Sequence, residues 1–232
     1  MSIVYLVPIV LHDTAIETIP LYIIDAVKDC QVIFAENERT ARRFLKSICK
    51  DIVIDDYEWF TLHKTENEQK ATFASKITAG KNIAILSEAG CPGVADPGQI
   101  LVEVAQQMNA TIKPLVGPSS ILLALMASGM NGQRFEFAGY LPIDVTERIN
   151  AIKEMEITSQ KKNSTQLFIE TPYRNEQMIA TLLKTCKAST RLCIAADLTS
   201  KNEYVKTKTI AEWRNEKTDF HKKPVIFLLL AN

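Results

Sequence analysis

The chain has 232 residues, of which 47% are hydrophobic and 23% charged, a composition typical of a soluble globular protein that excludes a disordered one. The formal net charge is zero, but residues 1–118 carry 11 basic and 15 acidic side chains (−4), and residues 119–232 carry 16 and 12 (+4). The second half therefore permits an anionic partner. The whole chain lacks the strongly basic balance of a general nucleic-acid-binding protein.

The five cysteines are scattered and form no Cys-x-x-Cys pair, so we expect reduced thiols in a cytoplasmic protein. The apolar stretches near the two ends are too short to span a membrane, and the first lacks the basic region of a signal peptide. His12, His63 and His221 do not have metal-ligand spacing, so the sequence predicts no metal site.

Strand-like and helix-like stretches alternate through the first half of the chain. Near-continuous apolar strands that alternate with helices predict a parallel sheet covered on both faces. The expected strands are 3–8, 31–35, 52–54, 82–86 and 111–116, and the expected helices are 15–28, 37–50, 66–79, 98–109 and 119–127.

The second half has a different pattern, with strands expected at 165–169, 191–195, 203–209 and 225–230 and a helix between the first two. Little helix separates the later strands, which favours a mixed or antiparallel sheet. We therefore predict an α/β protein of two domains, 1–117 with a mostly parallel sheet and 118–232 with a mixed sheet.

The most unusual segment is SEAGCPGVADPG (87–98), which holds three of the eight glycines and follows an apolar strand. Gly90 and Gly93 lack a Cβ, so a ligand can approach the backbone there. Asp96 and Pro97 are typical of an N-cap and a first helical turn. Ligands of parallel sheets bind where strands end, although turns and helix caps alone would explain this loop equally well. The sequence contains no dinucleotide or phosphate-loop motif.

Six segments, in chain order, resemble motifs of one known family. They are AENERTARR (35–43), SEAGCPGVADPG (87–98), VGPSS with ASG (116–129), FAGYLP (137–142), FIETPYR (168–174) and ADLT (196–199). Together they resemble the tetrapyrrole methylase superfamily, and most closely its branch containing ribosomal RNA small-subunit methyltransferase I.

The resemblance implies a two-domain fold with S-adenosylmethionine in the cleft between the domains, and a homodimer. It implies an enzyme, an S-adenosylmethionine-dependent methyltransferase that acts on ribosomal RNA of the small subunit at a ribose 2′-hydroxyl. Because one scaffold can serve several substrates, a tetrapyrrole methyltransferase and a non-catalytic S-adenosylmethionine-binding module are the alternatives.

The resemblance also assigns site residues. The cofactor-binding residues it implies are Pro8, Glu88, Ala89, Gly90, Cys91, Pro92, Ser119, Ser120, Ile169 and Pro224. Glu170 is the candidate catalytic acid or base, and Arg39, Arg43 and Arg174 are candidate substrate-binding residues. Alternatively, Glu170 caps the next helix or pairs with Arg174 four residues on, and Arg174 forms a salt bridge between the domains. The arginines near residue 40 would then lie on a solvated helix face. We do not expect nucleophilic catalysis by Cys91, because no histidine is adjacent to it in sequence.

Four positions depart from the family pattern. The first loop, PIVLHD (8–13), has no glycine; Glu88 replaces an aspartate, Tyr173 a histidine, and Ser200 a lysine. We expect cofactor binding to survive these changes, which bear instead on the identity of the substrate.

Overall fold

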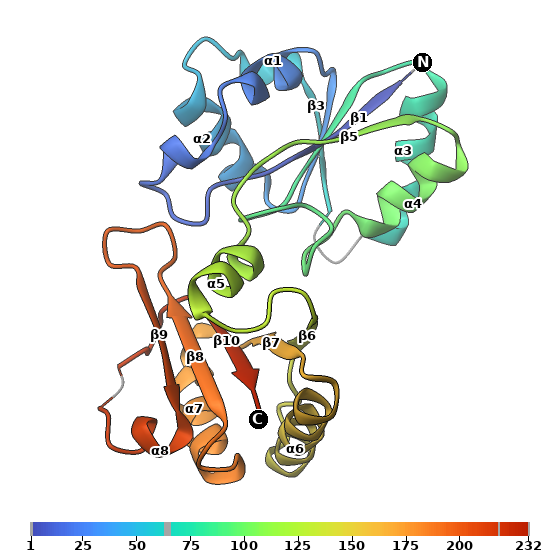
Figure 1. Cartoon of the computed structure of the whole chain (residues 1–232). Coiled ribbons are helices and arrows are strands. Elements are labelled where there is room, and N and C mark those ends of the chain that lie inside the picture. The colour runs from blue at the N-terminus through green and yellow to red at the C-terminus, as the bar shows by residue number, and fades with distance from the viewer. Residues whose placement is uncertain (1, 63–65, 218, 232) are drawn as a thin grey trace. The chain divides into compact units, whose positions relative to one another are not determined.

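The computed structural model describes residues 2–62, 66–217 and 219–231. The chain divides into two compact units, Met1–Ser119 and Ser120–Asn232, each built around a five-stranded sheet (Figure 1). None of the described helices is both long and apolar enough to cross a membrane.

The first unit is a parallel sheet between two pairs of helices. Its strands are β1 (Ile3–Val7), β2 (Val32–Ala35), β3 (Glu58–Thr61), β4 (Ile83–Leu86) and β5 (Thr111–Pro114), in the order β3-β2-β4-β1-β5. Its helices are α1 (Tyr22–Lys28), α2 (Glu38–Ile48), α3 (Glu66–Thr78) and α4 (Gln99–Gln107), with 3-10 turns at Ile16–Thr18 and Ile54–Asp56. Every strand pair is parallel, which confirms the predicted sheet type.

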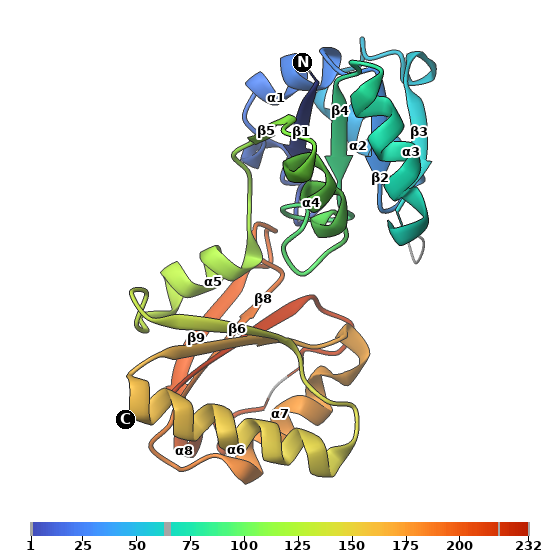
Figure 2. The ribbon, with the colours of Figure 1, turned by 90° about the vertical axis from the view of Figure 1, so that its right-hand side faces the viewer.

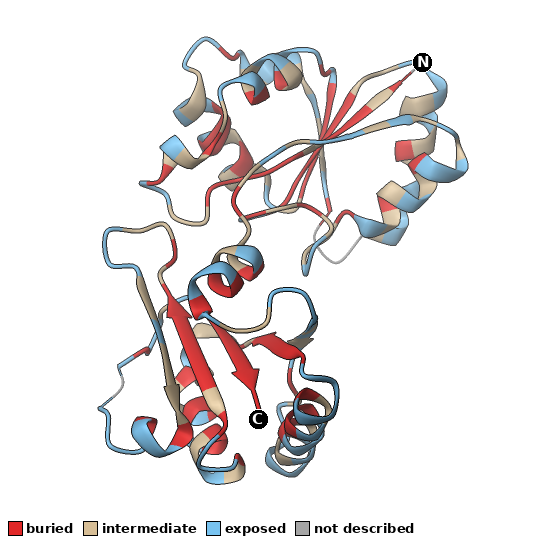
Figure 3. Cartoon of the chain, in the orientation of Figure 1, coloured by how far each residue is buried: buried red, intermediate tan, exposed pale blue. Residues whose placement is uncertain are grey.

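The central strands β1, β2 and β4 are largely buried on both faces and are mostly red in Figure 3, whereas the edge strands β3 and β5 have no buried residue. Successive side chains of a strand point to opposite faces. Tyr5 and Val7 accordingly pack in the cluster under α1 and α2, whereas Val4 packs in the cluster with α3 and α4. This two-sided burial explains why the central strands are apolar without alternation.

Two expectations for this unit are wrong. The strand expected at 52–54 is absent, because Ile54–Asp56 forms a 3-10 turn and the real edge strand is β3, whose Trp59 Nε1 donates to Ile54 O at 2.9 Å. The helix expected at 15–28 is divided at Pro20, since proline has no N–H to continue the helical hydrogen bonds.

The second unit contains a mixed sheet, as predicted. Its elements are α5 (Ser120–Ser128), β6 (Phe135–Tyr140), α6 (Val145–Lys162), β7 (Thr165–Ile169), a 3-10 turn (Pro172–Arg174), α7 (Asn175–Thr185), β8 (Arg191–Ala196), β9 (Tyr204–Thr209), α8 (Ile210–Trp213) and β10 (Val225–Leu230). In the order β6-β7-β10-β8-β9, only β6 and β7 are parallel neighbours. Figure 2 shows α5 on one face and α6, α7 and α8 on the other.

Sequence patterns missed β6 and α6. Strand β6 lies at the sheet edge and is largely exposed on both faces, and Gly139, with φ of 70°, interrupts its register, so no alternation marks it. Helix α6 does carry a start signal, because the Asp144 carboxylate accepts hydrogen bonds from the N–H groups of Thr146 and Glu147.

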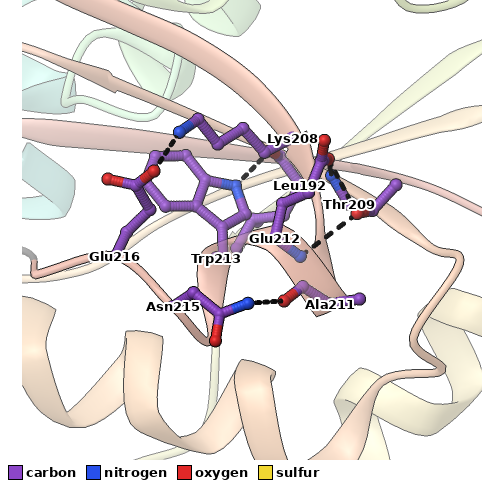
Figure 4. A network of polar contacts seen from close by, with 8 residues as sticks. All are labelled: Leu192, Lys208, Thr209, Ala211, Glu212, Trp213, Asn215 and Glu216. Carbon is purple, nitrogen blue, oxygen red and sulfur yellow. Dashed lines mark hydrogen bonds and ion pairs between the residues drawn. The ribbon is translucent and has the colours of Figure 1, made fainter.

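A network of polar contacts fixes α8 to the sheet (Figure 4). Thr209 and Glu212 form a capping box, with Glu212 N donating to Thr209 Oγ1 at 3.2 Å and Thr209 N to Glu212 Oε2 at 2.7 Å. The buried Trp213 donates its indole N–H to Leu192 O at 2.8 Å. A helix of four residues is not stable alone. The capping box and the Trp213 hydrogen bond therefore stabilise α8, and they keep the Trp213 indole in the core.

Candidate active site

The loops that follow β1, β2, β4 and β5 meet at one edge of the first sheet, here called the carboxyl edge. Strands β1 and β4 are neighbours, but the chain leaves β1 toward α1 on one face and leaves β4 toward α4 on the other. Such a reversal opens a crevice between the two loops, and ligands of open α/β sheets bind there. The sheet topology therefore singles out the loops after β1 and β4.

These two loops are joined by a backbone bridge. Ile9 N donates to Gly90 O at 2.9 Å, and Gly90 N donates to Ile9 O at 3.0 Å. Gly90 has φ of 71°, a conformation that residues with a Cβ rarely adopt. The glycine of this loop is thus required by the backbone conformation, and the bridge holds the neighbouring residues in a defined position.

The loop after β5 packs against the same place. A Cβ built on Gly117 would lie 2.3 Å from both Cβ and Cγ of the buried Pro8. The thiol of Cys91 lies 3.5 Å from Pro118 O, to which it donates. Burial, with a further contribution from Asp96, raises the pKa of Cys91. A raised pKa suppresses the thiolate, which agrees with the expectation that Cys91 is not a nucleophile.

Three carboxyl groups, Glu36, Glu88 and Asp96, lie in the segments that follow β2 and β4. Glu88 N donates to Glu36 Oε2 at 2.9 Å, and Asn37 Nδ2 donates to Glu88 Oε1 at 2.8 Å. Burial and then the charges of Glu36 and Glu88 raise the pKa of Asp96 to about 7. A carboxyl group moves this way when its surroundings disfavour more negative charge. The carboxyl edge is therefore suited to a group that carries positive charge.

The start of α4 differs from the prediction. Asp96 is not its N-cap; that position is Gly98, with φ of 123°. Instead the carboxylate of Glu66, at the start of α3, accepts from Gly98 N at 3.0 Å and from Ile100 N at 2.9 Å. The cap comes from a distant part of the chain, so no local pattern could reveal it. This arrangement leaves Asp96 within the loop, near the other carboxylates.

In the second unit, Glu170 and Arg174 form a buried ion pair. Glu170 Oε1 accepts from Arg174 Nε at 2.9 Å, from Arg174 Nη2 at 2.5 Å, and from Thr171 N at 2.6 Å. Glu170 Oε2 is buried and has no hydrogen-bond partner among the described residues. The i+4 pairing that the sequence left open is therefore present. Arg174 keeps a quarter of its side chain exposed and is oriented through Glu170.

The remaining predicted site residues differ in exposure. Arg39 and Arg43 are both exposed on α2, one turn apart, whereas Arg42 between them pairs with Glu38 at 2.6 Å. The residues in or bordering the first unit's loops are Pro8, Glu88, Ala89, Gly90, Cys91, Pro92 and Ser119, and those of the second unit are Ser120, Ile169 and Pro224. Pro224 follows the loop before β10, and its carbonyl accepts from Asp197 N at 3.1 Å.

No cluster of His, Cys, Asp and Glu that could hold a metal ion occurs in the part of the chain that the structure describes. His63 lies outside that part, while His12 Nδ1 forms hydrogen bonds with Oγ1 and N of Thr14, two residues on.

Sequence comparison finds a family and close relatives. The model of the family described as Tetrapyrrole (Corrin/Porphyrin) Methylases matches residues 15–213. The chain is 30% identical over 212 residues to ribosomal RNA small subunit methyltransferase I of Buchnera aphidicola, covering 89% of this chain and 71% of the relative. The protein of the same name from Bacillus subtilis is 30% identical over 220 residues (93% and 71%), and that of Vibrio cholerae is 32% identical over 175 residues (74% and 59%).

Solved structures with the same fold include the methyltransferase CobJ, with a TM-score of 0.67 and 14% identity over 100% of this chain and 95% of that one. Another is diphthine synthase, with a TM-score of 0.70 and 16% identity over 99% and 90%. At such low identity these likenesses establish the fold and say nothing about the substrate.

Proposed function

Because this chain belongs to the tetrapyrrole methylase family, we propose that it is an S-adenosylmethionine-dependent methyltransferase that 2′-O-methylates ribosomal RNA of the small subunit. The relatives named for that activity support the substrate class, and the chain spans between 59% and 71% of the length of the three described above. The single observation that carries the cofactor assignment is the carboxyl edge of the first sheet, where a bridged glycine loop lies beside three carboxyl groups.

The residues present fit S-adenosylmethionine. The cofactor supplies an activated methyl group on a sulfonium, and it also carries an ammonium group. Both positive charges suit the carboxyl edge, where Glu36 and Glu88 already raise the pKa of Asp96. We assign cofactor binding to Pro8 and residues 88–92, and to Ser119, Ser120, Ile169 and Pro224 in the second half of the chain.

Methyl transfer from a sulfonium needs an acceptor oxygen held in line, and orientation alone can lower such a barrier by about 7–11 kcal/mol. Arg174 is suited to hold a phosphate of the RNA through its planar guanidinium. Its Nε and Nη2 both donate to Glu170 Oε1, and these hydrogen bonds orient the group. The exposed Arg39 and Arg43 would contact the RNA backbone from α2.

Glu170 has two possible parts in this reaction. As a general base it would take the proton of the 2′-hydroxyl, and as a positioning residue it would act through Arg174. Its Oε1 is saturated by three hydrogen bonds, whereas Oε2 has none. We favour the positioning role, because the carboxylate is already committed to the guanidinium.

The proposal includes a homodimer in the cytoplasm, where ribosomal subunits are assembled. The resemblance to the family implies a homodimer and is the ground for this part of the proposal. Sedimentation velocity over a range of concentrations tests this part, and a monomer at all of them would refute it.

Tritiated methyl transfer tests the activity. Purified protein is incubated with labelled S-adenosylmethionine and either small ribosomal subunits from a strain without the endogenous enzyme or a porphyrin precursor. We expect label in ribosomal RNA, recovered after nuclease digestion as a 2′-O-methylated nucleoside. Label only on a porphyrin precursor, or binding of the cofactor without transfer to either substrate, would overturn the RNA assignment. Calorimetry with S-adenosylmethionine and S-adenosylhomocysteine tests the cofactor separately.

A further inference from the structure

Tyr173 presents its ring to solvent beside two basic side chains. It lies in the 3-10 turn Pro172–Arg174 after β7 and is 71% exposed. The His221 ring meets it edge-on, with centroids 6.0 Å apart and an interplanar angle of 75°. Lys222 Nζ lies 5.9 Å from the Tyr173 centroid, at the limit of cation–π range. These three residues, Tyr173, His221 and Lys222, are called the Tyr173 platform.

Hydrogen bonds hold the two backbone segments that carry the platform, the Pro172–Arg174 turn and residues 220–223. Asn175, which is completely buried, donates through Nδ2 to Phe220 O at 2.9 Å and to Lys223 O at 2.8 Å. Lys222 N donates to Pro172 O at 3.0 Å, which ties the histidine loop directly to the tyrosine turn. Because the buried Asn175 amide binds two carbonyls of the histidine loop, it holds that loop in one position beside the tyrosine turn.

Lys222 also has an unusual backbone conformation, with φ of 62°. For a residue with a Cβ this left-handed region costs about 1–2 kcal/mol. Strain of this kind persists only where the surrounding contacts impose it, and it clusters at binding and catalytic sites. Here the hydrogen bond from Lys222 N to Pro172 O is one of those contacts.

The aromatic ring and the basic side chains of the platform indicate what kind of ligand it would bind. A flat aromatic ring beside a lysine ammonium and an imidazole matches an unpaired nucleobase with its phosphates, since bases stack on such rings while basic groups track the backbone. Arg174, the proposed phosphate ligand, is the next residue after Tyr173. Two acidic neighbours are already engaged, Glu170 by Arg174 and Glu176 by Phe220 N at 2.7 Å, whereas Asp219, two residues before His221, is exposed.

We propose that the Tyr173 platform stacks an unpaired base of the substrate RNA and so positions the nucleotide next to Arg174. This inference rests on the proposed function and adds a recognition element to it. It assigns His221 and Lys222 to RNA binding, and it gives Tyr173 a task that depends on the ring and not on the hydroxyl.

Steady-state methylation of small subunits tests the proposal with Tyr173→Ala, Tyr173→Trp and a control, Ile157→Ala, at an exposed apolar position of α6. We expect Tyr173→Ala to raise KM for subunits about 5- to 100-fold, the range of one lost stacking contact. Tyr173→Trp should stay within about 3-fold of the wild type, since tryptophan also stacks. Calorimetric affinity for S-adenosylmethionine and the thermal midpoint should be unchanged. An unchanged KM in Tyr173→Ala, or an equal loss of cofactor affinity, would overturn the platform.

A direct binding measurement separates this inference from the proposed function. Single-stranded RNA carrying 2-aminopurine loses fluorescence when its base stacks on an aromatic ring. We expect quenching by the wild type and by Tyr173→Trp, and a loss of most of it in Tyr173→Ala. Tyr173-dependent quenching without methylation of subunits would support the platform and refute the proposed function. Methylation with quenching that does not depend on Tyr173 would support the function and refute the platform.

Discussion

The ring of Pro8 lies directly against the Cα of Gly117, so that a methyl group on Gly117 would lie 2.3 Å from two ring carbons. This contact joins the loop after β1 to the loop after β5, and both carry proposed cofactor ligands. Neither partner can yield easily, because one is a proline ring and the other is backbone. The carboxyl edge therefore depends on the absence of a side chain at residue 117.

Gly117→Ala is expected to lower the free energy of unfolding by about 1–3 kcal/mol, the usual cost of overpacking. It should also weaken S-adenosylmethionine binding, since Pro8 must move. Urea unfolding and calorimetry measure the two effects. Gly132→Ala is the matched control, because a Cβ there meets nothing within 4 Å. Equal behaviour of the two variants would show that the contact has no role in the site.

Glu66 anchors the start of α4, and its replacement should loosen that helix. In Glu66→Ala the N–H groups of Gly98 and Ile100 lose their acceptor, at a cost of about 1–2 kcal/mol. Glu66→Gln retains an oxygen acceptor and loses the favourable charge at a helix N-terminus, so it should cost less. Hydrogen exchange should accelerate in α4 and stay unchanged in α7. Uniform acceleration throughout the chain would contradict a local cap.

The raised pKa of Asp96 predicts how the free energy of unfolding changes with pH. The pKa is about 7 in the folded protein, against 3.8 for the ordinary group, so the folded state binds more protons between these values. Stability contributed by the protonated form is therefore present below pH 4 and is lost as the pH rises toward 7. One pKa unit corresponds to about 1.4 kcal/mol, but solvent screening of this partly exposed group reduces the loss to about 1–2 kcal/mol.

Asp96→Asn removes the titrating group and should abolish that loss. We expect the variant to match the wild type near pH 4 and to exceed its unfolding free energy by about 1–2 kcal/mol at pH 8. Denaturant unfolding from pH 4 to 8 measures the difference. The exposed Asp51→Asn serves as the control for removing one negative charge. A constant difference between Asp96→Asn and the wild type across this range would refute the raised pKa.

The parallel first sheet could be predicted because its central strands are short, apolar runs that alternate with helical patterns. Edge elements were harder. Strand β3 was expected at 52–54, where the apolar residues are, yet it begins at Glu58, because pairing with β2 and the Trp59 contact to Ile54 O outweigh local hydrophobicity. Strand β6 was missed because an exposed edge strand has no buried face to impose alternation.

For the candidate site, the sequence identified the loop at 87–98 but not the contacts that organise it. The bridge to Ile9 and the cap from Glu66 join residues tens of positions apart, and such pairs leave no local signal. The Tyr173 platform was missed for the same reason: His221 and Lys222 lie about fifty residues from the tyrosine and are brought to it by Asn175. One signal was available, because Tyr173 stands where the family pattern has histidine.

Glu170→Gln distinguishes the two roles of that residue. Glutamine keeps an oxygen for Arg174 but loses the charge, so a positioning role predicts a kcat/KM for subunits about 10- to 100-fold lower, through a weaker hold on the arginine. The pH profile should keep its shape, because no proton is transferred to this group. If Glu170 is instead the general base, kcat should fall by about 10²–10⁴-fold and the acidic limb of the profile should disappear.

Arg174→Lys supplies the matched comparison, because lysine retains the charge but has no planar guanidinium with which to make the two hydrogen bonds to Glu170 Oε1 or to bind a phosphate in bidentate fashion. Under the positioning role its kcat/KM should fall about as far as that of Glu170→Gln, and the double variant should lose little more, since both changes break one unit. Strictly additive losses would show that the two residues act independently. In that case the carboxylate would have a task of its own, and the general-base role would be the better account of Glu170.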